Sequence, residues 1–362
     1  MFLDFLEDHQ IAALIILPVS GSGMVINWFI AAFIGRLKTL KNPFGLLTRS
    51  QSIGEAIHTT VFTLYVVPML FFDIDWMKEN SRFSGTIILI AYDIGIWSHF
   101  TISINRMCAI FFPLNYNCIF SIRNTKIVIC ILWIGTIVPA YYFYTWTSPE
   151  CNIFFKFDFY RYTFTQNDLC FAIIMYFDLM KYIIVVIIIA IIDSATIIKV
   201  HLVNIEMRSR TSTRFNRRKR SEEINFLKQA CMQAFCFLCE LICYFFLEPG
   251  VENKWTKFVL STMTFVSLHF VDGLITVSFN REFRMLLPCY NQNNAIQTSY
   301  PSHGAYPRRT GANSAAIDRV TQSGGQSSKA AADYDSHMIY GAHPRDIQRI
   351  PSKNNRIFLI ST

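Results

Sequence analysis

Seven stretches of the chain are poor in charged residues and long enough to cross a membrane. They lie at about residues 11–34, 51–72, 83–110, 126–146, 171–197, 229–248 and 256–279. A helix that spans the hydrocarbon core needs roughly 17–25 mostly apolar residues. Runs such as "YIIVVIIIAII" (182–192) do not alternate as barrel strands do. Because a helix satisfies its own backbone in lipid, the pattern predicts an all-α membrane protein, a bundle of seven transmembrane helices.

The loops between these stretches differ in charge. Lysine and arginine gather after the first, third and fifth stretches, most densely in "RSRTSTRFNRRKR" (208–220), and acids outnumber bases in the other loops. Basic loops stay in the cytoplasm, so the amino terminus is predicted outside and the carboxyl terminus inside. The expected organisation is a short extracellular segment over 1–10, a seven-helix domain with a short amphipathic helix over 11–290, and a tail over 291–362. The tail is cytoplasmic and, from its composition, disordered.

Composition supports lipid as the main solvent and argues against several other classes of protein. Apolar residues make up 52% and charged residues 16% of the chain, whereas soluble domains carry about 25% charged residues. The net charge of +8 suggests nucleic acid until the bases are located, because they lie in loops between spans. No HExxH, GxSxG or P-loop motif occurs. We therefore predict no catalytic residue, cofactor, metal or nucleic-acid partner.

Two motifs and a pair of cysteines carry a family resemblance. The motifs are "INRMCAIFFPLNYNCIF" (104–120) at the end of the third span and "HFVDGLITVSFNREF" (269–283) at the end of the seventh. With two extracellular cysteines that flank an aromatic loop, the chain resembles the G-protein-coupled receptor superfamily, and within it the nematode serpentine chemoreceptors of class X. The resemblance implies a receptor for an unidentified small molecule or odorant in the plasma membrane or a sensory cilium. Its partners would be a heterotrimeric G protein and the bilayer, with receptor oligomers left open.

The resemblance assigns roles to residues at the cytoplasmic ends of the spans. Arg106 would meet the carboxyl-terminal helix of a G-protein α subunit, and Asn105 stands where rhodopsin-like receptors carry an acid that pairs with the arginine. Because Asn105 is neutral, Glu222 and Glu223 near the start of span six are the candidates to restrain Arg106 in the inactive state. An arginine at such an interface also has a simpler interpretation, since it reaches lipid headgroups and anchors the helix.

Span seven departs from the rhodopsin-like pattern at the positions of its switch motif. Aligned on "NREF", the residues Asp272, Gly273 and Thr276 stand where Asn, Pro and Tyr are usual. Gly273 could loosen the helix without the missing donor of proline. Span six has no proline before Pro249, so a swing of a kinked span six is in question. Cys289, after the expected short helix, is a candidate for palmitoylation.

Of the ten cysteines, two are predicted to lie outside, in the loop between spans four and five. An oxidising exterior makes Cys151 and Cys170 disulfide partners, and the bond should stabilise the fold by about 3 kcal/mol. The more familiar bridge to the top of span three cannot form, because Ser81 stands there. Cys236 and Cys239 form a C-x-x-C that we interpret as small residues packing within span six, since a metal site would need further ligands.

Ionisable residues inside the spans are costly and mark candidate functional sites. Spacings of three place Glu55 with His58, Asp178 with Lys181, and His269 with Asp272 on shared helix faces. Such pairs keep an ion- or proton-coupled transporter and a ligand-gated channel open as alternatives, beside a peptide-type G-protein-coupled receptor. The predicted ligand pocket, in the outer half of the bundle and rich in aromatic residues, contains Asp93, Trp97, Asp178 and His269.

Overall fold

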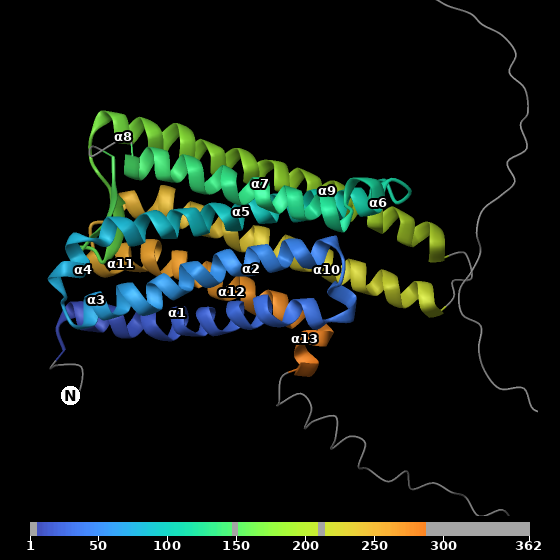
Figure 1. Ribbon diagram of the computed structural model, residues 1–362, viewed down its shortest axis with the longest axis horizontal. Coiled ribbons are helices and arrows are strands. Elements are labelled where there is room, and N and C mark those ends of the chain that lie inside the picture. Colours follow the sequence, from blue (N-terminus) through green and yellow to red (C-terminus); the bar gives the residue numbers. More distant parts are fainter. Residues whose placement is uncertain (1–5, 147–150, 209–213, 287–362) are drawn as a thin grey trace, which may run out of the picture. The chain divides into compact units, whose positions relative to one another are not determined.

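A computed structural model describes residues 6–146, 151–208 and 214–286 of the 362. In this part of the chain, seven helices are long and apolar enough to cross a membrane, and they run lengthwise beside one another (Figure 1). The predicted fold class is thus confirmed. The spans are α1 (Asp8–Phe33), α2 (Pro43–Val61) with α3 (Val67–Phe71), α5 (Ser81–Phe111), α7 (Ile122–Tyr141), α8 (Asp168–Ile173) with α9 (Met180–Arg208), α10 (Arg214–Leu241), and α11 (Lys254–Phe258) with α12 (Thr264–Phe279).

The third span forms the centre of the bundle. In the most hydrophobic window of Ser81–Phe111, 61% of residues are buried, against 22% for Ile122–Trp146 in the fourth span. Helix α5 contacts α2, α7, α9 and α10. By contrast, α7 and α9 expose aliphatic side chains such as Ile131 (65%) and Ile191 (63%). Apolar surface of this extent needs lipid around it.

The second span begins eight residues earlier than hydropathy predicted, at Pro43 instead of residue 51. The Asn42 side chain caps the helix by accepting a hydrogen bond from Gly45 N at 2.9 Å, and Pro43 occupies the first turn. Polar residues of this segment, including Thr48 and Ser50, are buried against other helices. A hydropathy count treats such residues as exposed loop, which explains the late predicted start.

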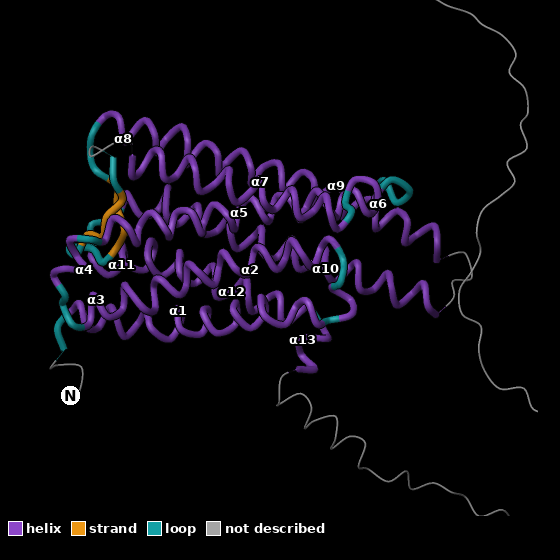
Figure 2. Tube along the Cα trace, viewed as in Figure 1, coloured by secondary structure: helices purple, strands orange, loops and turns teal. Residues whose placement is uncertain are grey.

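One end of the bundle carries a β-hairpin where the sequence predicted only a loop (Figure 2). Strand β1 (Ile153–Lys156) pairs antiparallel with β2 (Arg161–Phe164). The Cys151–Cys170 disulfide is present, as predicted. Ser81, which replaces the cysteine of the familiar bridge, accepts a hydrogen bond from Phe155 N at 3.1 Å. The hairpin is therefore attached to span three by hydrogen bonds as well as to span five by the disulfide. We call this the hairpin end.

A second contact holds the hairpin on the bundle. The Tyr162 hydroxyl lies 2.7 Å from Ser84 Oγ on α5, and burial raises the pKa of Tyr162 above its ordinary value, so the hydroxyl keeps its proton. Thr262 Oγ1 in span seven donates to Tyr160 O at 2.6 Å. The hairpin thus bridges spans three and seven and covers this end of the bundle.

The opposite end carries two short helices, α6 (Tyr116–Ile119) and α13 (Arg281–Leu286). Phe283 of α13 is fully buried and lies 6.0 Å from Phe29 between ring centroids. Thr39 N donates to Glu282 Oε2 at 3.3 Å. Helix α13 is therefore packed against the first span and the loop that follows it. We call this the Arg106 end.

Gly273 lets the first and seventh spans approach closely, while α12 continues through it. A Cβ at Gly273 would lie 2.6 Å from Asn27 Oδ1 and 2.8 Å from Ile26 Cγ2. Asn27 cannot easily turn away, because its Nδ2 donates to His269 O at 2.9 Å. We expect Gly273→Ala to destabilise the protein by about 1–3 kcal/mol through overpacking.

The measurement is the melting temperature of the purified protein. Gly135→Ala is the matched control, because a Cβ there meets nothing within 4 Å and alanine favours helix by up to about 1 kcal/mol. The two substitutions should change the melting temperature in opposite directions. Equal shifts would contradict the packing role of Gly273.

Candidate functional site

Arg106 lies near the end of α5 and is 7% exposed. Its guanidinium carbon is 3.4 Å from the centroid of the Phe44 ring, at the start of α2. A planar guanidinium over an aromatic face is a favourable cation–π arrangement. This packing between spans two and three holds the arginine at the end of the bundle where the sequence placed it.

Asn105 contacts the loop that follows span three. Its Nδ2 donates to Tyr116 Oη in α6 at 3.1 Å, and the Asn105 side chain is buried. The amide that replaces the usual acid therefore anchors α6 beside span three. Glu222 and Glu223 belong to α10, but their side chains lie outside the described residues, as does Cys289. Their predicted roles stay predictions.

A groove of about 200 Å³ lies between α9 and α10 towards the Arg106 end. Its lining is mostly aliphatic with two basic side chains. The residues are Ile197, Val200, His201, Ile224, Leu227, Lys228 and Cys231. This groove gives the ends of spans five and six a concave, partly basic surface.

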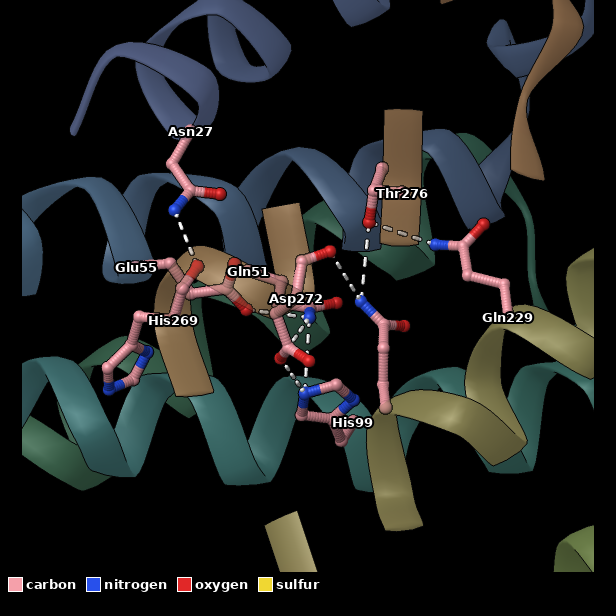
Figure 3. Close-up of polar contacts among 9 residues, drawn as sticks. Asn27, Gln51, Glu55, His99, Gln229, His269, Asp272 and Thr276 are labelled. Atoms are coloured by element: carbon pink, nitrogen blue, oxygen red, sulfur yellow. Dashed lines mark hydrogen bonds and ion pairs between the residues drawn. The ribbon is translucent and has the colours of Figure 1, made fainter. Parts of the chain in front are cut away.

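A buried polar network crosses the middle of the bundle (Figure 3). Gln51 Nε2 donates to Glu55 Oε1 at 2.7 Å and to Asp272 Oδ2 at 3.4 Å. His99 Nε2 lies 2.8 Å from Asp272 Oδ2 and 3.1 Å from Gln51 Nε2. The network joins spans two, three and seven, all through side chains that are at most 6% exposed.

The switch positions predicted in span seven belong to the same region. Gln229 Nε2 and Gln233 Nε2 on α10 donate to Thr276 Oγ1 at 3.1 and 3.3 Å. Gln233 Nε2 also donates to Asp272 O at 3.3 Å. Span six is thus connected to span seven at both Asp272 and Thr276, and a movement of either span must break or exchange these bonds.

Three side chains of the network could together hold a cation. One ligand atom each of Glu55, His99 and Asp272 lies within 4.8 Å of the other two. His99 and Asp272 already contact each other directly, and the amide of Gln51 bonds both carboxylates. The same contacts form a hydrogen-bond network without an ion, although Gln51 Oε1 and Asp272 Oδ1 have no hydrogen-bond partner among the described residues.

The two histidines that the sequence paired with acids instead lie against each other with tilted rings. The ring centroids of His58 and His269 are 3.8 Å apart, and both side chains are buried. The Phe265 ring packs edge-on against His58 with centroids 4.7 Å apart. His269 therefore lies beside span two and does not line either cavity described below, although the sequence placed it in the ligand pocket.

A cluster of charges lies nearer the hairpin end between spans three and five. Lys181 Nζ is 2.8 Å from Asp93 Oδ1 and 3.4 Å from Asp178 Oδ1. Tyr182 Oη donates to Asp93 at 2.8 Å, and Tyr144 Oη donates to Asp178 at 2.5 Å. The predicted i,i+3 pair Asp178–Lys181 is therefore in ion-pair contact. Lys181 also pairs with Asp93 on span three.

A lateral cavity of about 560 Å³ lies between spans three, four and five. Asp93, Trp97 and Asp178 of the predicted pocket all line it, together with Lys181 and Phe177. Its volume falls in the range of about 300–1,000 Å³ typical of small-molecule sites. Its wall includes the exposed Ile131 of α7, so the cavity opens towards the lipid-facing side.

An inner cavity of about 50 Å³ lies beneath the hairpin. Its lining is mainly aromatic, and Leu89 and Asp178 are shared with the lateral cavity. Several of its residues, among them Phe62, Tyr244 and Ser261, lie in π-helical turns of spans two, six and seven. Such turns are frequent at functional sites because they re-aim side chains. Span six, which lacks a proline there, has its irregularity at Ile242–Leu247.

The main residue that the sequence left without a role is Glu240. It lines the inner cavity and accepts a hydrogen bond from Tyr92 Oη at 2.7 Å. Glu240 lies inside the predicted sixth span (229–248), where an acid is costly and marks a candidate functional site. No spacing along span six indicates that Tyr92 of span three is the partner of Glu240. The one signal in the sequence was therefore the rarity of an acid inside a span.

A family model and two similar proteins agree on one family. A family model described as "Serpentine type 7TM GPCR chemoreceptor Srx" matches residues 17–280. The Caenorhabditis elegans protein "Serpentine receptor class X 45" is 32% identical over 314 residues, which cover 81% of this chain and 85% of that protein. A second protein from that organism, "Serpentine receptor class X-43", is 25% identical over 295 residues, covering 78% and 87%. Squid rhodopsin has a similar fold, with a TM-score of 0.64 at 15% identity over 81% of this chain and 80% of that chain.

Proposed function

The chain belongs to the Srx family of serpentine seven-transmembrane GPCR chemoreceptors, and we propose that it detects a small organic molecule beneath the hairpin and activates a heterotrimeric G protein at the Arg106 end. The observation that carries the proposal is the course of α5. This central helix contributes Tyr92 to the inner cavity, His99 to the polar network and Arg106 to the opposite end.

The polar network supports coupling between the two ends. A ligand shifts a receptor between states only by its difference in affinity for them. Span six reaches from Tyr244 at the inner cavity to the groove beside Leu227, and its glutamines bond span seven between those points. A ligand that moves span six therefore changes the network and the groove together.

Two features support an orientation with the hairpin outside the cell. Disulfides persist in oxidising surroundings, which favours the extracellular side for Cys151 and Cys170. The basic loops of the sequence, including 208–220, follow spans that end on the other side. The plasma membrane, including that of a sensory cilium, is the proposed location.

The shape of the inner cavity favours a small molecule over a peptide. The hairpin contributes Ile153, Arg161 and Tyr162 to the cavity wall, and it is held on the bundle by the disulfide and by Ser81. A peptide would have to displace this covered end of the bundle. A small organic molecule needs only movements of side chains.

The contacts favour a receptor over a transporter. A proton or ion path through Glu55–His58, Asp178–Lys181 and His269–Asp272 was the basis of that alternative. In the described part of the chain, Glu55 and Asp272 bond through Gln51, whereas Asp178 belongs to the cluster around Lys181. The rings of His58 and His269 pack against each other instead of joining these acids.

The test is an agonist screen in cells that express the receptor with a promiscuous G protein. We expect at least one small organic molecule to raise the second-messenger signal above that of untransfected cells. The same receptor in proteoliposomes without G protein should show neither uptake nor current with that molecule. Uptake or current under those conditions would replace the receptor mechanism with transport or a channel.

A further inference from the structure

The charged residues around the inner cavity are paired, with one exception. Asp93 and Asp178 share Lys181. Glu248 has Arg161 Nη1 at 2.5 Å and Lys257 Nζ at 3.8 Å. Glu240 contacts the hydroxyl of Tyr92, and among the described residues no basic side chain lies within ion-pair distance of it. The cluster around Lys181 thus has one acid in excess and the cluster around Glu248 one base in excess, whereas Glu240 is the acid without any basic partner.

Glu240 is in a place where an unmatched carboxylate is costly. Its side chain is 4% exposed, and a buried charge without a partner is strongly unfavourable. A carboxylate offers about four acceptor positions, and Tyr92 occupies one of them. The group thus presents unused acceptor capacity on the wall of a cavity.

Aromatic rings line the same cavity as the Glu240 carboxylate. Tyr92, Tyr244, Phe245 and Phe265 line the same cavity, and Tyr92 packs 4.9 Å from Phe265 between ring centroids. The faces of aromatic rings attract cations, and rings around an ammonium group form its usual binding site. A carboxylate within aromatic walls is therefore complementary to a small organic cation.

We propose that the inner cavity recognises a small protonated aliphatic amine, with Glu240 as its counter-ion. The inference rests on the proposed function, because it assigns a ligand class to that receptor. A cavity of about 50 Å³ holds roughly three to five water-sized groups, since each needs about 10–15 Å³ of such volume. Amines of about three to five non-hydrogen atoms fit without rearrangement of the walls.

The same charges disfavour other ligand classes. The charge of the Arg161 guanidinium at the cavity wall is paired with Glu248, and although its Nε has no hydrogen-bond partner among the described residues, an anion would have to compete with that carboxylate. An anionic ligand would also face Glu240 and Asp178, and like charges at close range are repulsive. A neutral alcohol of equal size fills the same space but gains no charge pairing with Glu240.

The experiment measures binding of propylamine, 1-propanol and propionate to the full-length receptor in lipid nanodiscs, by the shift of its melting temperature with ligand concentration. We expect propylamine to bind at least tenfold more tightly than 1-propanol, and propionate to give no shift. Glu240→Gln keeps an acceptor for Tyr92 and should weaken propylamine binding at least tenfold. Glu252→Gln, which removes an exposed acid near the same end, should leave the binding unchanged.

Equal binding of propylamine and 1-propanol by the wild-type receptor would overturn the inference, whether or not Glu240→Gln folds. So would unchanged propylamine affinity in a folded Glu240→Gln receptor. If propylamine fails but another molecule activates the G protein, the receptor function stands and only the ligand class is wrong.

Discussion

Replacing Arg106 with alanine should reduce G-protein activation at least tenfold while the receptor still reaches the cell surface. The last carbonyl groups of a helix lack partners within the helix, and its carboxyl-terminal end carries partial negative charge. A guanidinium offers five donors in a fixed plane, which suits that end of a G-protein helix. Arg106 has this group at the end of the central helix, held over Phe44.

The measurement is nucleotide exchange on a G protein by receptor in nanodiscs, with agonist and without, beside surface labelling of expressing cells. Arg106→Lys keeps the charge but loses the planar fork, so its exchange rate should lie between those of the wild type and the alanine variant. Arg123→Ala removes an exposed arginine at the same end and serves as the matched control. Wild-type exchange by a surface-expressed Arg106→Ala receptor would exclude Arg106 from coupling.

Replacing both Cys151 and Cys170 with serine should lower the stability of the receptor by about 3 kcal/mol, because the bond closes a loop in the unfolded chain. The bond joins positions separated by 19 residues, and both cysteines are fully buried. Its loss would leave the hairpin attached through Ser81 and Tyr162. The cover of the inner cavity should therefore loosen as well as the fold.

Thermal unfolding in detergent and the fraction of receptor at the cell surface both report this loss. Both should fall for the double variant, and treatment of the wild type with a reductant should reproduce the lower melting temperature. Cys118→Ser together with Cys130→Ser is the matched control, because both are exposed and free in the structure. If the double variant has the same melting temperature as the wild type, hydrogen bonds alone are sufficient to hold the hairpin.

Features that depend on one segment at a time could be predicted from the sequence. Each span is apolar because lipid surrounds part of it, so the seven spans followed from hydropathy. The Cys151–Cys170 bond followed because topology left those two cysteines on the outer side. The same reliance on apolar residues placed the start of span two too late. The polar residues after Pro43 are buried against other helices, so hydropathy did not count them as part of the span.

Partners across the bundle could not be predicted from spacing along one helix. The i,i+3 rule joined His269 with Asp272, but Asp272 contacts His99 of span three and His269 packs against His58 of span two. Lys181 reaches Asp93 on span three as well as Asp178 on its own span. Asn105 bonds Tyr116 in a short helix that hydropathy does not reveal.

The sequence by itself determined the seven spans, the charge difference between the two ends and the identity of the disulfide partners, because these depend on composition within a segment. Only the tertiary structure decided which polar groups meet, and so left Glu240 as the unmatched acid at the inner cavity. The rotation of each helix decides this, and close contacts set that rotation, such as Gly273 against Asn27. Each such contact involves side chains of more than one span, and the pattern along a single segment holds no information about the other spans.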